Sequence, residues 1–555
     1  MAFVAAPEPV PATSLPDLDL TIAALHAKKD AWKDVSLADR AALLDRCITS
    51  MVAVSERWAA AGARIKGLAP DHAGEEWVSG PMPSIRNARL LANALRQGGA
   101  PKPASVSEHG GRTVARVFPS TTMEKLMFAG VRADVWIKRG KPASQGAVYR
   151  DTPEKGRVAL VLGGGNVSSI PPMDALYKLF VEGELVLLKM NPVNESIGPI
   201  LAEGLAPLVD GGWLAIVYGG ADVGAHAAAH AKIDSLHVTG SDRTYDAIVW
   251  AKNDKTAGVR ANDKPFTAEL GCVTPVIVVP GPWSESDLRF QARHVASMVT
   301  HNASFNCNAA KVVVVAKEWL QREAFVRMID EELARTPARK AYYPGAKERY
   351  RAFIDHYPKA RVVGETGDEV VPWTVLAIEG STYALENEAF CGVVAIVALE
   401  APDHGNASPT DFLEKAVTFA NDRCWGTLSC CVLVHPATEK THPAAVTKAI
   451  DELRYGGIGI NVWPGLIYGL VSPSWGAFPG HSPDDIRSGV GVVHNAWLFD
   501  HPEKSVVRGP FRIRPTPAWF SDHKNLDGLG RALVAFEAAP TWKGFAKVVL
   551  AGLKG

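Results

Sequence analysis

Short apolar runs alternate with helix-like segments along the middle of the chain, beginning at Arg157. The runs end in turn-forming residues, whereas the segments between them repeat apolar residues every three or four positions. Repeated strand, helix and strand units predict a parallel sheet with helices on both faces, which is a doubly wound α/β domain. The expected strands are Val158–Leu162, Leu185–Lys189, Leu214–Tyr218 and Ser235–Thr239, and the expected helices are Met173–Glu182, Ser196–Leu208 and Asp222–Ala231.

A second series of similar units follows and predicts a second α/β domain. A chain of 555 residues is too long for one ordinary core, so we expect three parts, residues 1–272, 273–465 and 466–555. Nearer the N-terminus, residues 19–61 have a helical pattern in which Ser36 and Asp39 resemble a capping box. Further strands are expected at Ala133–Ile137, Pro275–Val279, Lys311–Ala316, Val394–Ala398 and Cys430–Val434, with a helix at Ser284–Thr300.

Composition and charge exclude several classes of protein. Lys plus Arg equals Asp plus Glu at 59 each, so no net charge attracts nucleic acid or an anionic membrane. No apolar run is long enough to span a membrane, and residues 1–16 lack the features of a secretory signal. The seven cysteines are scattered, which favours a reducing, cytoplasmic compartment over a disulfide framework. The histidines and cysteines form no ligand-spaced cluster, so we expect no metal.

Candidate ligand-binding residues follow each expected strand of the first domain. Ligands of doubly wound sheets bind beyond the carboxyl ends of the strands, so these positions are where chemistry is expected. Each segment taken alone also fits an ordinary turn, since no complete dinucleotide or phosphate-loop motif is present. The segments are Gly163-Gly164-Gly165-Asn166, Lys189-Met190-Asn191-Pro192, Gly219-Gly220 and Thr239-Gly240-Ser241.

In this order, the segments resemble the aldehyde dehydrogenase superfamily over roughly Gly146 to Trp497. Departures from the family pattern are Ser304-Phe305 in place of Gly-Gln, Pro192 in place of a ribose-binding Glu, and Cys391-Gly392 in place of Gly-Pro. The chain therefore resembles a remote member. The segments that match are Gly164-Gly165-Asn166, Lys189, Thr239-Gly240-Ser241, Glu269-Leu270-Gly271, Asn302 to Cys307, Glu388-Ala389-Phe390, and Ala420-Asn421 with Gly426.

The resemblance implies that an aldehyde is oxidised through a covalent thioester on Cys307. A nucleophile must attack the carbonyl before hydride can leave, and the polar residues around Cys307 could expose its thiol and stabilise its thiolate. Asn166 and the backbone N–H of Cys307 would stabilise the oxyanion, and Glu269 would activate water. The alternatives are a core cysteine, a turn asparagine and a solvated carboxylate. Cys272 is the rival nucleophile, because it follows Glu269-Leu270-Gly271 directly.

The resemblance also implies a nicotinamide cofactor in the first domain and the nucleophile in the second. Since Pro192 removes a carboxylate that would repel a 2′-phosphate, NAD and NADP both stay open. The strand-like segment before Tyr149 and the tail after Gly465 resemble the family's oligomerisation elements, so we expect a homodimer or homotetramer. The residues implied for the cofactor, each of which could instead be structural, are Lys189, Thr239, Gly240, Ser241, Glu388 and Phe390.

Two other functions remain open. Val273-Thr274-Pro275 and Ser474-Trp475-Gly476 resemble segments of CoA-acylating aldehyde dehydrogenases and acyl-CoA reductases, in which CoA takes the acyl group. Glu269 favours water as the acceptor, because acylating members generally lack that carboxylate. The other alternative is a non-catalytic relative that serves as a binding protein; the trio Asn166, Glu269 and Cys307 argues against it.

Overall fold

The computed structural model of the chain describes residues 3–4, 7–68, 72–151, 153–251, 255, 258–378 and 381–555. In it, the N-terminal region forms two helical segments joined by a bend. Helix α1 (Leu15–Lys28) continues into η1 (Lys29–Trp32), and α2 (Leu37–Ile65) follows. The helical pattern expected over residues 19–61 is confirmed, with a break between Trp32 and Leu37. Ser36 caps α2 by accepting the N–H of Asp39, and buried Trp32 packs on Phe180 with ring centroids 5.5 Å apart, so the chain turns between them.

The first sheet has the doubly wound arrangement that the sequence predicts. Its strand order is β19-β8-β7-β4-β5-β6, in which all neighbours are parallel except β19 and β8. The order reverses at β4, so the carboxyl ends of β4, β5 and β7 form a crevice of the kind that binds ligands. The strands are β4 (Val158–Leu162), β5 (Leu185–Lys189), β6 (Leu214–Val217), β7 (Ser235–Thr239), β8 (Phe266–Glu269) and β19 (Gly489–Val490), which confirms the four expected strands to within one residue.

Helices cover this sheet, and one expected helix is broken. The segment 196–208 forms η2, α8 and α9 rather than one helix. Pro207 lacks the N–H that would bond to the carbonyl of Glu203, so a continuous helix cannot pass this point. The helices are α7 (Ile170–Phe180), η2 (Glu195–Ile197), α8 (Gly198–Gly204), α9 (Ala206–Val209), α10 (Ala221–Ala229) and α11 (Asp242–Val249).

The second sheet has the order β1-β2-β3-β21-β17-β16-β9-β10-β13-β12-β11. Its central strands from β21 to β12 are parallel, and β1, β2 and β3 extend it as an antiparallel edge. The strands are β1 (Ser105–His109), β2 (Arg112–Phe118), β3 (Arg132–Ile137), β9 (Thr274–Val278), β10 (Ala310–Ala316), β11 (Arg361–Val362), β12 (Thr374–Ala377), β13 (Val393–Leu399), β16 (Ser429–Leu433), β17 (Gly457–Ile460) and β21 (Pro502–Arg508).

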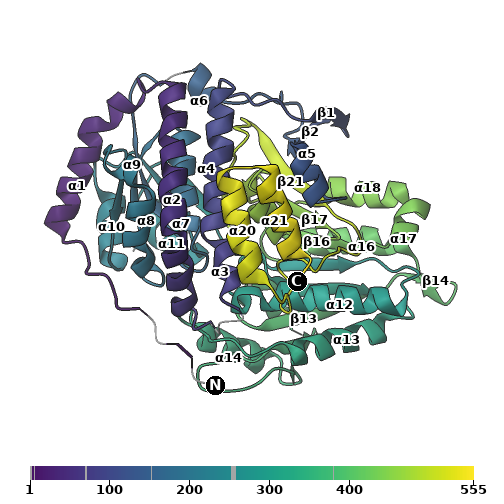
Figure 1. Cartoon of the computed structure of the whole chain (residues 1–555). Helices are drawn as coiled ribbons and strands as arrows, with labels where there is room; N and C mark the ends of the chain where they lie inside the picture. Colours follow the sequence, from purple (N-terminus) through teal and green to yellow (C-terminus); the bar gives the residue numbers. More distant parts are fainter. Residues whose placement is uncertain are drawn as a thin grey trace.

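The second sheet has its own helices, which lie apart from those of the first sheet (Figure 1). Two-stranded pairs are formed by β14 (Pro402–Asp403) with β15 (Asn406–Ala407), and by β18 (Trp475–Gly476) with β20 (Val492–His494). The helices are α12 (Glu285–Thr300), η4 (His301–Ser304), α13 (Arg322–Arg335), α14 (Ala346–His356), α15 (Tyr383–Glu386), α16 (Pro409–Arg423), α17 (Pro436–Thr441), α18 (Pro443–Glu452) and α19 (Gly465–Leu470).

A layer of helices from both ends of the chain lies in front of the two sheets (Figure 1). Helices α2, α4, α20 and α21 pack side by side there, so the C-terminal segment rests on the N-terminal helices. The three-part division stays a prediction; within it, β1–β3 join the second sheet and β19 joins the first. The remaining helices are α3 (Gly74–Ser79), α4 (Pro81–Arg96), α5 (Thr122–Met127), α6 (Ala147–Arg150), α20 (Leu526–Ala538) and α21 (Trp542–Gly552).

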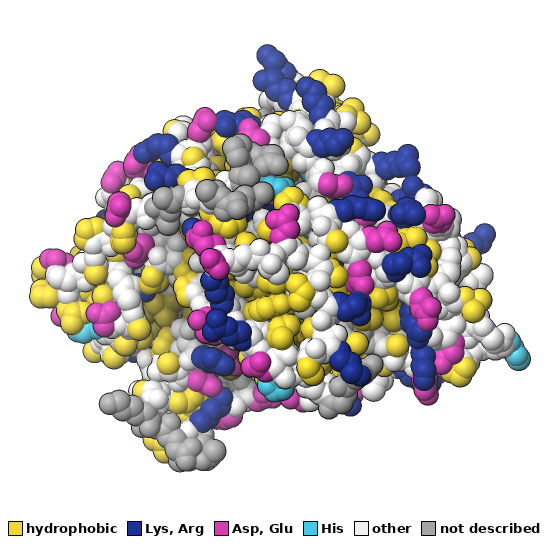
Figure 2. All heavy atoms as spheres, turned by 90° about the horizontal axis from the view of Figure 1, so that it is seen from below, with side chains coloured by type: hydrophobic (Ala, Val, Ile, Leu, Met, Phe, Trp, Pro, Cys, Tyr) yellow, Lys and Arg dark blue, Asp and Glu magenta, His cyan; other side chains and the backbone are white. Residues whose placement is uncertain are grey.

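The surface seen from below carries side chains of both charges interspersed with apolar ones (Figure 2). This agrees with the equal totals of acidic and basic residues in the sequence. None of the helices in the described part of the chain is both long and apolar enough to cross a membrane.

Candidate active site

A cavity of about 770 Å³ opens beyond the carboxyl ends of the first sheet and extends to residues of the second domain. Strands β4, β5, β7 and β8 each end at its wall. All nine residues that the sequence proposed for catalysis and cofactor binding line this one cavity, although they come from both domains. They are Asn166, Lys189, Thr239, Gly240, Ser241, Glu269, Cys307, Glu388 and Phe390.

The loop that presents Cys307 has a strained backbone. Asn302, Ala303 and Ser304 all have positive φ, at 54°, 55° and 69°, a conformation that side chains other than glycine rarely adopt. The amide of Asn302 holds this turn by donating to the carbonyls of Asn166 and Phe305, each at 3.0 Å. Strain of this kind gathers at functional sites, where surrounding contacts compensate it.

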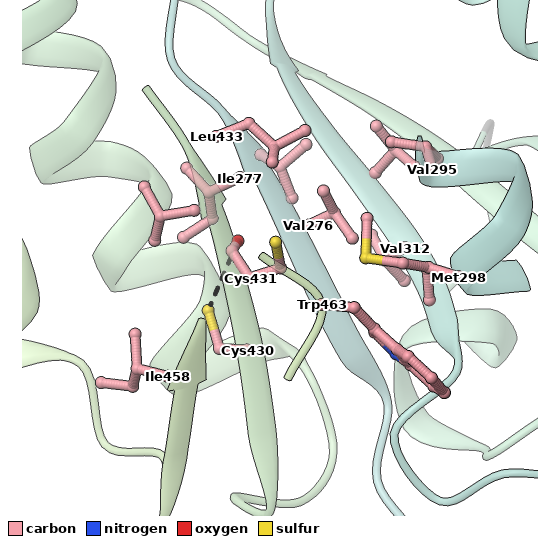
Figure 3. Close-up of a cluster of buried hydrophobic side chains, with 14 of the residues drawn as sticks. Val276, Ile277, Val295, Met298, Val312, Cys430, Cys431, Leu433, Ile458 and Trp463 are labelled. Atoms are coloured by element: carbon pink, nitrogen blue, oxygen red, sulfur yellow. Dashed lines mark hydrogen bonds between the residues drawn. The ribbon is translucent and has the colours of Figure 1, made fainter. Parts of the chain in front are cut away.

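Cys307 stands apart from the other cysteines in its access to solvent. All seven lie in the described part of the chain; Cys307 is partly exposed and the other six are buried. The rival Cys272 is fully buried, and its sulfur lies 3.9 Å from the carbonyl of Ser429. Cys430 and Cys431 pack among apolar side chains of β9, β16 and α12, as Figure 3 shows. The geometry therefore leaves Cys307 as the accessible thiol.

Cys307 and Glu269 face each other, and each affects the ionisation of the other. Burial raises the pKa of the Cys307 thiol well above its usual value, and the negative charge of Glu269 adds to this. Burial also raises the pKa of Glu269 to about 8. A hydrogen bond from Cys307 lowers this pKa, and the negative charges of Asp174 and Glu388 raise it further. The expectation that polar neighbours stabilise the Cys307 thiolate is therefore wrong, because burial and the carboxylate of Glu269 outweigh them.

Asn166 lies beside the Cys307 loop, 7% exposed at the cavity wall. Its side-chain amide donates to the carbonyl of Phe305 at 2.9 Å, and its own carbonyl accepts from the hydroxyl of Tyr342 at 3.1 Å. A primary amide has two hydrogens, so one remains for another acceptor. The side chain is therefore fixed next to the nucleophile with a donor available.

The residues proposed for the cofactor occupy the rest of the wall. Lys189 ends β5, and burial lowers the pKa of its ammonium group. Ser241 caps α11 by accepting the N–H of Thr244, so the N-terminus of this helix faces the cavity. Glu388 is 17% exposed and paired with Lys311, and Phe390 packs on Tyr343 with ring centroids 5.0 Å apart.

Two groups beside the site were not found from the sequence. Asp174 on α7 is buried, accepts from Thr239 at 2.8 Å and from His494 at 3.0 Å, and lies 3.3 Å from His237. Lys311 is buried at the start of β10. The sequence signal that could have identified both residues is a charged side chain inside an otherwise apolar helix or strand, because such a group needs a buried partner. The described residues include no group of three or more His, Cys, Asp or Glu side chains placed to hold a metal ion.

Comparison with known proteins gives partial matches in sequence. The model of the aldehyde dehydrogenase family matches residues 158–346. Coniferyl aldehyde dehydrogenase of Pseudomonas sp. is 27% identical over 230 residues, which is 38% of this chain and 45% of that one. N-succinylglutamate 5-semialdehyde dehydrogenase of Sphingopyxis alaskensis is 30% identical over 156 residues, or 28% and 30% of the two chains. The matches thus span less than half the length of these curated relatives.

Solved structures match over most of the chain. An NADP-dependent glyceraldehyde-3-phosphate dehydrogenase from Bacillus halodurans has a TM-score of 0.59 at 17% identity, covering 90% of this chain and 92% of that one. Indole-3-acetaldehyde dehydrogenase of P. syringae has a TM-score of 0.61 at 17% identity, covering 90% of each. These likenesses show the fold. The family model covers the part of the chain that holds β4 to β10 and the Cys307 segment, so this part resembles aldehyde dehydrogenases in sequence as well.

Proposed function

We propose that the protein oxidises an aldehyde to a carboxylic acid with NAD or NADP, through a thioester on Cys307. The observation that carries this proposal is the convergence of Cys307, Glu269 and Asn166 on one wall of a cavity that also holds every residue proposed for the cofactor. The relatives named above act on aldehydes, and the two solved structures were determined with NADP or NAD⁺. Both facts support this reading of the site.

The cavity suits a dinucleotide. The N-terminus of α11 supplies backbone N–H groups and a positive dipole end for a pyrophosphate. Lys189 offers an ammonium group for ribose hydroxyls, and the carboxylate of Glu388, whose side chain is 17% exposed at the cavity wall, offers an acceptor. Phe390 offers an apolar face. When bound, the nicotinamide supplies the acceptor for hydride. Pro192 is exposed after β5 and brings no carboxylate, so either dinucleotide fits.

Each of the three catalytic residues has one task. The thiol of Cys307 releases its proton to solvent, its sulfur forms a bond to the aldehyde carbon, and the carbonyl oxygen becomes an oxyanion. Asn166 and the N–H of Cys307 donate to that oxygen; one such donor typically contributes about 10²- to 10³-fold in rate. After oxidation, Glu269 removes a proton from water, whose oxygen attacks the thioester. The acid leaves, and the proton returns to the sulfur.

The second candidate is transfer of the acyl group to CoA. It rests on Val273-Thr274-Pro275 and on Ser474-Trp475-Gly476, but Ser474 and Trp475 are buried at 5% and 2%, and Trp475 lies near Glu269. Glu269 lies against Cys307, where a base for water is required. The position of this carboxylate supports water as the acceptor.

Glu269→Gln separates the two reactions. With water as acceptor, the variant should still acylate, so reduced cofactor appears as a burst of about one equivalent per site, and steady turnover falls by roughly 10²- to 10⁴-fold. With CoA as acceptor, wild-type turnover requires added CoA and is insensitive to the substitution, because the CoA thiolate is itself nucleophilic. A panel of aldehydes with both nicotinamides, with and without CoA, provides the readout. Turnover that needs CoA and survives Glu269→Gln would falsify the hydrolytic proposal.

A further inference from the structure

Lys311 is a buried lysine directly beneath the loop of the nucleophile. It is 4% exposed at the start of β10. Its ammonium donates to the carbonyl of Asn306 at 2.9 Å and to that of Ala309 at 3.2 Å. These carbonyls belong to residues on either side of Cys307, so Lys311 fixes the segment that presents the thiol.

The same ammonium group reaches the cofactor side of the cavity. Its nitrogen lies 3.3 Å from Oε1 of Glu388, an ion pair without an aligned hydrogen bond. The other carboxylate oxygen rests against Gly271, where an added Cβ would lie 2.0 Å from it. No other carboxylate of the described residues is within ion-pair distance of Lys311. Glu388 is therefore the counter-charge of a buried cation, and it still lines the cavity.

We propose that Lys311 is a positioning residue that couples the two halves of the site, so that occupation of Glu388 by a ribose changes the reactivity of Cys307. This rests on the proposed function, which takes Glu388 as a ribose ligand. Ribose hydroxyls that donate to Glu388 draw its charge away from Lys311. The positive charge of Lys311 then acts more strongly on the sulfur of Cys307. The ammonium is already held near this sulfur by its hydrogen bonds to the carbonyls of Asn306 and Ala309.

The charges around Cys307 fix the direction of the effect. Glu269 from β8, Glu388 from the loop after α15 and Lys311 from β10 face the thiol, and the hydroxyl of Tyr468 on α19 lies close by. After burial, the two carboxylates raise the pKa of the thiol, whereas Lys311 lowers it. Any change that frees Lys311 from Glu388 should favour the thiolate, and loss of Lys311 should disfavour it.

The test is the pH midpoint of Cys307 alkylation by iodoacetamide, followed by mass spectrometry of the peptide that contains Cys307. For the wild type, saturating NAD or NADP should lower the midpoint by about one unit, a tenfold change in thiolate fraction. Lys311→Met should raise the midpoint without cofactor and abolish the response, and Lys311→Arg should keep part of it. Lys317→Met is the matched control, because Lys317 follows the same strand but pairs with Glu400 at the surface.

Glu388→Gln provides an independent variant should Lys311→Met fail to fold. It removes the counter-charge, so its midpoint without cofactor should fall toward that of the cofactor-bound wild type, opposite to the shift of Lys311→Met. A purely structural role would not give opposite shifts. A full cofactor response in either variant overturns the coupling. Quenching of tryptophan fluorescence reports dinucleotide binding. A wild type that binds no dinucleotide and oxidises no aldehyde refutes the proposed function and the coupling together. If the wild type binds dinucleotide and oxidises an aldehyde, but a variant keeps the full cofactor response, only the coupling is refuted.

Discussion

At the scale of single residues, access to the cavity distinguishes Cys307 from the six buried cysteines. Cys307→Ala should lower aldehyde turnover by about 10³-fold or more, because it removes the atom that forms the covalent bond. Dinucleotide affinity should stay within about threefold, since the thiol forms no part of the proposed cofactor wall. Steady-state kinetics and fluorescence titration measure the two effects. Cys272→Ala is the control, and unchanged turnover of Cys307→Ala would refute the assignment.

The raised pKa of Glu269 also has a consequence for stability. The folded protein holds a proton on this carboxyl up to a pH of about 8, whereas the unfolded chain releases it near 4.5. The folded state therefore binds more protons between these values, so the contribution of Glu269 to the free energy of unfolding falls as pH rises through this window. Glu269→Gln should thus raise the melting temperature relative to wild type at pH 8.5 and much less at pH 5. Equal differences at both pH values would contradict the shifted pKa.

The sequence could place these residues but not their electrostatics. Asn166 follows β4 and Glu269 ends β8 at one edge of the first sheet, and motif order adds Cys307 from the loop between α12 and β10. The ionisation of Cys307 depends on burial and on carboxylates more than 30 residues away in the chain, and no local pattern contains that information. The positive φ of Ser304, where a glycine would be expected, was likewise hidden.

At the scale of secondary-structure elements, Asp174 joins α7 to β7 and β20. Its carboxylate is buried, and although burial alone would raise its pKa, His237 and His494 hold it at about 2. Because the folded pKa is below the ordinary 3.8, the stability it provides is present above pH 4 and is lost as pH falls toward 2. Asp174→Asn should therefore cost about 3 kcal/mol of unfolding free energy at pH 7, as for one partner of a buried charged pair.

Denaturant unfolding of Asp174→Asn measures this cost. Asp45→Asn is the control, since Asp45 pairs with Arg96 on the surface with side chains about half exposed. Such a pair contributes about 0 to 1 kcal/mol. Equal losses in the two variants would show that the contacts of Asp174 with Thr239, His237 and His494 contribute no special stability.

Strands were easier to predict than helices for a physical reason. Strands such as β5 and β10 are buried on both faces, so apolar residues run almost unbroken along them and the run has sharp ends. Helix ends depend on single residues, as Pro207 and Ser36 show. Residues 66–144 gave little signal, because β1 is exposed along its length and Pro81 and Pro83 at the start of α4 obscure its periodicity.

At the scale of the whole molecule, the order of the strands could not be predicted from local patterns. β3 pairs with β21, and Trp136 lies opposite Lys504, although several hundred residues separate them in the chain. Such pairings follow from which apolar faces are left uncovered after both domains form. The sequence therefore predicts the two α/β units, and the structure adds how the chain returns to join them.

The edge of the second sheet leads to the last prediction, a homodimer or homotetramer. β1 is paired with β2 on one side alone, and Val106 in it is 56% exposed, so the strand presents backbone groups and an apolar side chain. Light scattering should then give two or four times the 59.4 kDa of one chain at micromolar concentration.

Val106→Lys should shift the assembly toward smaller species, because a charged edge disfavours pairing between strands. Leu320→Lys is the control, since Leu320 is 77% exposed but lies between β10 and α13 rather than in β1, and it should leave the mass unchanged. A wild type with the mass of one chain would contradict the assembly itself. An unchanged mass for Val106→Lys would instead leave an assembly built on another surface.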